Sequence, residues 1–92
     1  MKVNITFSGP LAGYAGIENA RIELPQSACF EDLLSEIGHR YGCNMPALIW
    51  DPGRGRFTHH VLVMKGSKHL TDLKEPLDKS EEIKFFLVML GG

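Results

Sequence analysis

The chain begins with a strict alternation of apolar and polar residues. Val3, Ile5 and Phe7 are separated by polar side chains, which is the two-residue period of a half-buried β-strand over residues 2–8. The same alternation returns over residues 19–24 and ends at Pro25. The stretch between them contains three glycines and a proline, so we interpret residues 9–16 as a hairpin loop joining two antiparallel strands.

The apolar period then changes to that of an amphipathic helix over residues 30–41. Ser27 or Cys29 can be its N-cap, and Ser27 is chemically the better one because its hydroxyl accepts a backbone N–H. Acidic residues lie in the first turn and basic residues in the last, and Gly42 follows where a left-handed C′ residue belongs. The apolar stripe consists of Phe30, Leu33, Leu34, Ile37 and Tyr41.

The second half of the chain predicts further strands. Residues 43–58 form a loop, interrupted by an apolar piece at 47–50 that packs on the core or forms a short edge strand. The apolar run 60–65 is typical of a strand covered on both faces. A tight turn, a short strand around His69 and a last strand over 82–90 follow. We therefore expect an α+β fold, a mixed sheet of four to five strands with one main helix packed across one face. The right-handed crossover rule places its first and last strands side by side.

Length and charge narrow the classes of function. Ninety-two residues predict a single domain spanning 1–92, with one modest core and no separate substrate domain. Ten basic residues nearly balance eleven acidic ones, which disfavours nucleic acid and anionic lipid as partners. No apolar run has the roughly 20 residues of a membrane span, and the start does not resemble a signal peptide. Two cysteines outside any CxxC pattern favour reduced thiols and a cytoplasmic location.

Several candidate sites have simpler interpretations. Four histidines, at positions 39, 59, 60 and 69, lack metal-ligand spacing, so we predict no metal site. The glycines of residues 9–16 match no phosphate-loop spacing, which favours the hairpin loop. Arg54 and Arg56 faintly resemble an RNA-binding segment, but a single copy in a near-neutral chain is a solvated turn. No serine lies in a nucleophile setting such as G-x-S-x-G, so we expect no catalytic residue.

The end of the chain carries the most specific signal. The apolar run 85–90 leads directly into Gly91 and Gly92. Because glycine has no Cβ, such a tail can enter a narrow slot and present its terminal carboxylate to a partner's active site. The alternation of the last strand places Phe86, Val88 and Leu90 on the face away from the helix, as a partner-docking patch. The alternative is that the segment around Trp50 covers that face.

These features together resemble the ThiS/MoaD family of ubiquitin-like sulfur carriers. The resemblance rests on the order of elements, the helix pattern, the diglycine end and the segment 77–86, which is similar to the family's L-x-D-G-D-E-V-x-F-F. Lys79-Ser80 and the apolar segment 87–90 depart from the family pattern. The resemblance implies a β-grasp fold with a flexible Gly91-Gly92 tail.

The resemblance also implies a chemical cycle. A partner that resembles the ubiquitin-activating enzymes uses ATP and magnesium to adenylate the Gly92 carboxylate. Sulfur from a persulfide then gives a thiocarboxylate, which a sulfur-accepting synthase uses. The chain itself binds no cofactor and is a carrier or substrate protein rather than an enzyme, at most the small non-catalytic subunit of a synthase.

Three hypotheses remain open at this point. The first is a sulfur carrier. The long 43–58 connection is more similar to molybdopterin-type small subunits, or to the related carrier of a cysteine-forming pathway, than to the shorter thiamin-type carriers, and we favour the molybdopterin type. The second is a ubiquitin-like modifier linked through Gly92 to lysines of target proteins. The third is a β-grasp interaction module in which the diglycine is incidental.

Overall fold

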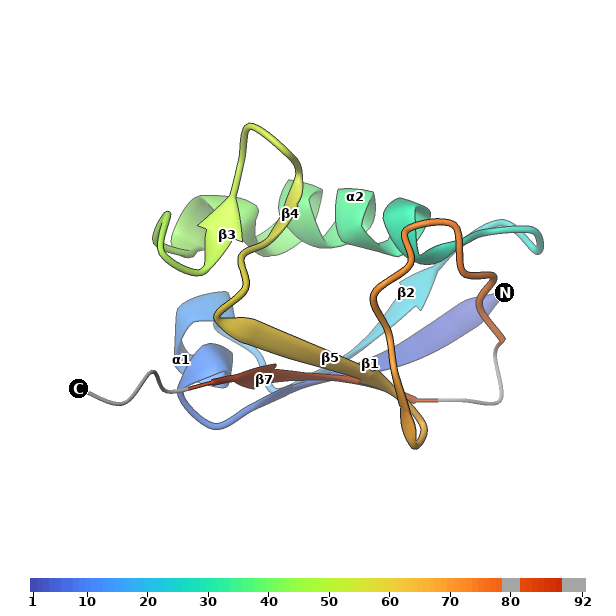
Figure 1. Ribbon diagram of the computed structural model, residues 1–92, viewed down its shortest axis with the longest axis horizontal. Coiled ribbons are helices and arrows are strands. Elements are labelled where there is room, and N and C mark those ends of the chain that lie inside the picture. The colour runs from blue at the N-terminus through green and yellow to red at the C-terminus, as the bar shows by residue number, and fades with distance from the viewer. Residues whose placement is uncertain (79–81, 89–92) are drawn as a thin grey trace.

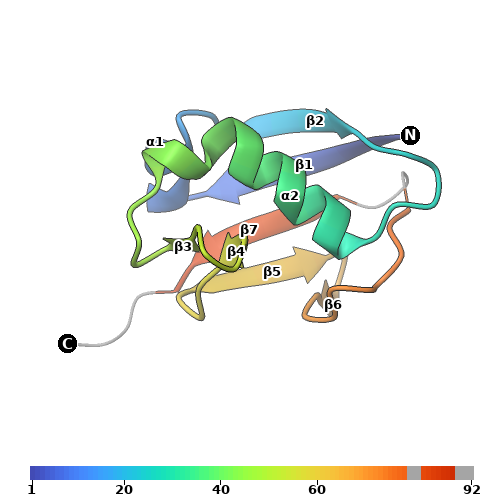
Figure 2. The ribbon, with the colours of Figure 1, turned by 90° about the horizontal axis from the view of Figure 1, so that it is seen from above.

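A twisted five-stranded sheet forms one layer of the molecule, and helix α2 (Phe30–Tyr41) lies across one face of it (Figures 1 and 2). The computed structural model describes residues 1–78 and 82–88. The strand order is β2-β1-β7-β5-β6, and β1 and β7 pair in parallel at its centre, as the crossover rule predicts. The strands are β1 (Lys2–Ser8), β2 (Asn19–Glu23), β5 (Val61–Lys65), β6 (Lys68–His69) and β7 (Ile83–Leu87).

The core lies between this sheet and α2. Alternate residues of the two central strands, including Ile5, Phe7 and Phe85, are almost completely buried and meet the apolar stripe of the helix. The rings of Phe7 and Phe85 lie 5.3 Å apart, and Phe7 also meets Tyr41 edge-on at 5.6 Å. The strand and helix periods of the sequence therefore identify the two surfaces that bury one another.

The stretch predicted as a simple hairpin loop contains a helix. Residues Pro10–Ala15 form α1, which begins after Gly9 and ends at the left-handed Gly16. Proline suits the first helical position because its fixed φ is already helical and its missing N–H needs no partner. Leu11 and Ala15, one turn apart, are buried on the core and stabilise this short helix. The antiparallel pairing of β1 and β2 is as predicted.

The ends of α2 differ in part from the prediction. Of the two predicted N-cap residues, the cap is Cys29 and not the chemically favoured Ser27. The Cys29 backbone N–H donates to Asp32 Oδ2 at 2.8 Å, so the carboxylate of the third helical residue satisfies the N–H of the cap residue. At the other end Gly42 has a right-handed conformation with φ −59°, because the chain continues into a 3-10 turn, η1 (Gly42–Asn44).

The apolar piece 47–50 leads into a separate two-stranded hairpin, β3 (Trp50–Asp51) with β4 (Arg56–Phe57). Trp50 is 4% exposed. Its ring meets Phe57 edge-on at 4.9 Å, and Phe57 meets Phe85 at 5.2 Å. Figure 1 shows this hairpin beside α2, on the same side of the main sheet. The prediction that residues 47–50 pack on the core or form a short strand is confirmed.

The run 60–65 is not covered on both faces as predicted. Strand β5 alternates instead, with Val61 and Val63 buried and Leu62 and Met64 only half-buried. The prediction failed because both faces of the strand are apolar in sequence, although only one of them faces α2. The predicted turn is present at Gly66, which has a positive φ of 62°, and a short strand follows it.

Candidate functional site

The face of the sheet turned away from α2 carries an apolar patch across β5 and β7. Phe86 is paired in register with Leu62, and Lys84 with Met64. Beyond the end of β7 the Val88 N–H donates to the His60 carbonyl at 2.6 Å, so this antiparallel alignment continues for one more residue. We call the four apolar side chains on this face the sheet patch: Leu62, Met64, Phe86 and Val88.

The exposure of these four side chains indicates a surface that is available for contact rather than a second buried core. Val88 is 41% exposed, and the other three members of the sheet patch are half-buried. The alternative that the Trp50 segment covers this face is wrong, because Trp50 packs on α2 and Phe57 on the opposite side of the sheet. Among the residues that the structure describes, no segment lies over the sheet patch.

Polar groups border the patch at the start of β7. The Thr6 hydroxyl lies 2.6 Å from Glu82 Oε2 and 3.0 Å from Asn19 Oδ1. Lys84 Nζ lies 3.9 Å from Glu82 Oε1. Phe86 and Val88, by contrast, lie at and just beyond the end of β7. This arrangement suits a partner that binds the open face and receives the tail at the same time.

The predicted site residues divide into two groups. Phe86 and Val88 lie on the open face, as their alternation predicts. Leu90, Gly91 and Gly92 lie outside the described residues. Sequence reasoning missed Leu62 and Met64 because their strand was interpreted as covered on both faces. The antiparallel register with β7 is the signal that identifies them.

Ionisable groups with displaced pKa values lie on the α2 side rather than at the patch. Hydrogen bonds from Cys29 hold the pKa of Asp32 below its ordinary value, and the Glu31 carboxylate raises the pKa of Lys74. Hydrogen bonds from Lys65 and Lys68 lower the pKa of Glu75. These groups cap a helix or hold a loop, so the shifts have structural causes.

The part of the chain that the structure describes holds no cluster of three potential metal ligands, and both cysteines are free thiols. None of its helices is long and apolar enough to cross a bilayer. The candidate site is thus an exposed surface next to a chain terminus.

Solved structures share this architecture. SAMP1 from Haloferax volcanii superimposes with a TM-score of 0.80 at 20% identity over the full length of both chains. The chain folds as a ubiquitin-like β-grasp protein. A putative molybdopterin converting factor, subunit 1, from Pyrococcus furiosus gives a TM-score of 0.73 at 21% identity over 97% of this chain and 99% of that one. Urm1 from Trypanosoma brucei gives 0.75 at 15% identity over 99% and 95%. No protein-family model matches the sequence, and no curated protein does.

These neighbours agree with the resemblance given by the sequence, since a putative molybdopterin converting factor subunit is among the proteins that share the fold. They also include proteins titled as modifiers. The β-grasp fold expected from the sequence is confirmed as well.

Proposed function

We propose that this protein is a cytoplasmic sulfur carrier whose Gly92 carboxylate is adenylated and then converted to a thiocarboxylate. The observation that carries the proposal is the sheet patch, whose last member, Val88, lies three residues before Gly91 in the sequence. A β-grasp domain with an open apolar face and a diglycine end has the parts that such a carrier needs. Its likeness to a molybdopterin converting factor subunit favours the molybdopterin pathway as the destination of the sulfur.

The chemistry requires activation because a carboxylate is a poor acyl donor. A carboxylate oxygen attacks the α-phosphorus of ATP, pyrophosphate leaves, and an acyl-adenylate forms. The terminal sulfur of a persulfide then attacks the carbonyl carbon and AMP leaves. A second thiol cleaves the S–S bond and is oxidised to a disulfide, so that one sulfur stays on Gly92. A sulfur-accepting synthase uses this thiocarboxylate.

In these steps the adenylating partner and this chain have different roles. The adenylating partner binds ATP and magnesium and supplies the electrostatic stabilisation of the transition state. This chain supplies a docking face through Phe86 and Val88, a slender tail and one reacting atom. It acts as a substrate protein and not as an enzyme.

The likeness to SAMP1, titled small archaeal modifier protein 1, favours a second candidate. In that function the activated Gly92 carbonyl is attacked by a lysine amine of a target protein, and an amide forms. Both functions need the same adenylate, so they differ only in the final nucleophile.

Intact-mass spectrometry of the protein made in its own cell tests the proposal. A mass increase that matches one oxygen replaced by sulfur, absent from a Gly92 deletion variant, supports the carrier. Branched peptides that carry a Gly-Gly remnant on lysine support the modifier instead. If neither species forms and the Gly92 deletion has no phenotype, both functions are wrong and the chain is an interaction module.

A further inference from the structure

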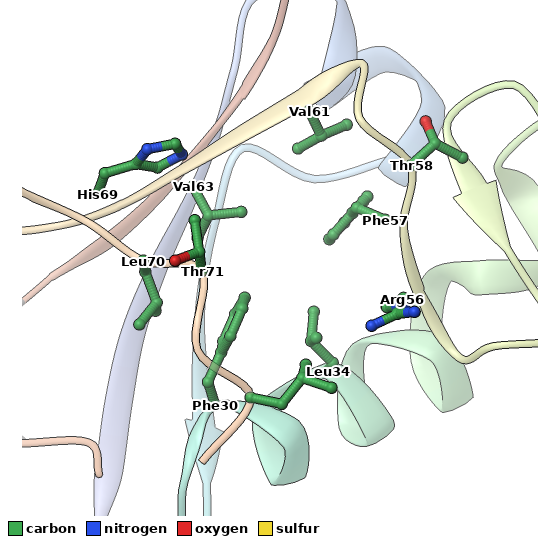
Figure 3. Close-up of a pocket in the computed structure, with 11 residues that line it drawn as sticks. Phe30, Leu34, Arg56, Phe57, Thr58, Val61, Val63, His69, Leu70 and Thr71 are labelled. Atoms are coloured by element: carbon green, nitrogen blue, oxygen red, sulfur yellow. The ribbon is translucent and has the colours of Figure 1, made fainter. Parts of the chain in front are cut away.

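A small cavity lies on the α2 side of the sheet, away from the sheet patch. It has a volume of about 160 Å³ and lies between α2, β4, β5 and the segment after β6 (Figure 3). Apolar side chains form the larger part of its wall, and Phe30, Leu34, Val63 and Leu70 among them are buried core residues. An apolar cavity of roughly 150 Å³ is large enough to hold a benzene molecule, so this cavity has room for one ring-sized apolar group.

Arg56 is the only arginine or lysine among the described residues that line this cavity, and His69 lies at its edge. Arg56 lines the cavity and is half-buried, and Figure 3 shows it beside Leu34. Within residues 1–78 and 82–88, the Arg56 side chain has no hydrogen-bond or ion-pair partner. Thr58 and Thr71 add hydroxyls around it. A half-buried guanidinium beside apolar walls is stabilised most by a carboxylate, which it can bind through two parallel hydrogen bonds.

The acid next to Arg56 in the hairpin does not provide that carboxylate. Asp51 is the cross-strand partner of Arg56. Its Oδ1 accepts from the backbone N–H groups of Gly53 and Arg54, and its Oδ2 lies 3.7 Å from Arg54 Nε. The guanidinium of Arg56 is left as the charge that an incoming anion would meet.

We propose that this cavity binds a free small monocarboxylic acid with a compact, ring-sized apolar body. The apolar body occupies the space between Phe30, Leu34 and Val63, and the carboxylate pairs with Arg56. The site is separate from the sheet patch and the tail, so the inference does not depend on the proposed sulfur chemistry.

Benzoate is the probe, and a methyl-selective NMR titration of the full chain is the measurement. Saturable shifts of the Leu34, Val63 and Leu70 methyl signals are expected, with a dissociation constant of about 0.1–1 mM for a ligand of this size. The neutral isostere benzamide is expected to bind more weakly. Arg56→Gln is expected to weaken benzoate binding by about tenfold or more and to leave benzamide binding unchanged.

Arg40→Gln is the matched control. Arg40 lies on α2, its side chain is 44% exposed, and it pairs with Glu36 at 3.1 Å. It does not line this cavity, so its removal should leave benzoate affinity unchanged. Three outcomes overturn the proposal: no saturable shift, equal affinity for benzoate and benzamide, or equal losses in the two arginine variants. Tighter binding of N-acetyl-phenylalanine than of benzoate also overturns it, because the site would then be one for a peptide C-terminus.

Discussion

Two glycines on one side of α2 allow the Trp50 ring to lie directly against the helix backbone. A Cβ placed on Gly38 would lie 2.5 Å from Trp50 Cζ2, and one on Gly42 would lie 2.9 Å from Trp50 Nε1. Alanine normally stabilises a helix relative to glycine, but here the added methyl group would overlap a buried ring. We expect Gly38→Ala to lower the free energy of unfolding by about 1–3 kcal/mol, measured by urea denaturation.

Gly13→Ala is the control for this prediction. Gly13 also lies within a helix, α1, but a Cβ added there has no heavy atom within 4 Å. This variant is expected to gain about 0.5–1 kcal/mol of stability from the better helix former. Similar changes in both variants would show that the Trp50 contact does not decide the cost at position 38.

For single residues, the sequence predicted burial better than it predicted contacts between residues. The alternation of Val3, Ile5 and Phe7 identified three core residues correctly, because a strand period depends only on neighbours in the chain. The contact of Gly38 with Trp50 joins residues twelve positions apart through two different elements. No local pattern encodes such a contact, so the structure was needed to find it.

The loop that follows β6 is held to the sheet by a buried lysine. Lys65, at the end of β5, is 8% exposed, and its Nζ donates to Glu75 Oε2 at 2.9 Å and to the Pro76 carbonyl at 3.1 Å. These hydrogen bonds stabilise the charged carboxylate, so the pKa of Glu75 falls below its ordinary 4.5 in the folded state. The pair therefore stabilises the fold at neutral pH, and that contribution is lost as the pH falls below 4.5 toward the folded pKa.

Glu75→Gln tests the stabilising role of the pair that Lys65 forms with Glu75. The variant should be less stable than the wild type at pH 7. The difference should shrink at pH 3, which is below the ordinary pKa of 4.5, because the carboxylate of the unfolded chain then binds a proton. Denaturant unfolding at the two pH values measures both differences. Glu31→Gln, which breaks the exposed pair with Lys74, is the control and should change stability little at either pH. A Glu75→Gln deficit that is the same at pH 3 as at pH 7 would contradict the assigned titration.

Elements with a clear period were predicted well. The α2 helix and the strands β1 and β2 have enough residues for their periods to be recognised. The short helix α1 and the pairing of β3 with β4 were missed, because each owes its stability to packing on the core. Leu11 and Trp50 are the anchors in these two cases, and both are almost completely buried.

On the scale of the whole molecule, the two faces of the sheet have different roles. One face is closed by α2 and the β3–β4 hairpin, and the other leaves the sheet patch in contact with solvent. The sequence alone identified Phe86 and Val88, because the end of the chain showed a clear alternation. It could not identify Leu62 and Met64, since their place beside β7 depends on strand order and register, which arise only when the whole sheet forms.

If the sheet patch binds the adenylating partner, it should contribute more to partner binding than to folding. Phe86→Ala removes a half-buried ring at the centre of the patch, and we expect it to weaken binding by about 2 kcal/mol or more, as a central aromatic contact does. Isothermal titration calorimetry with the adenylating enzyme measures this change, and thermal unfolding measures the accompanying loss of stability, which should be smaller.

Leu48→Ala provides a matched control for Phe86→Ala. Leu48 is 65% exposed and lies in the segment before β3, on the α2 side of the sheet. Its removal also deletes exposed apolar surface, but on the face that the proposed partner does not contact, so partner affinity should stay the same. If Leu48→Ala weakens binding as much as Phe86→Ala does, the partner does not select the open face. If Phe86→Ala affects only the unfolding temperature, Phe86 stabilises the sheet rather than docking a partner, and the enzyme must recognise the tail without it.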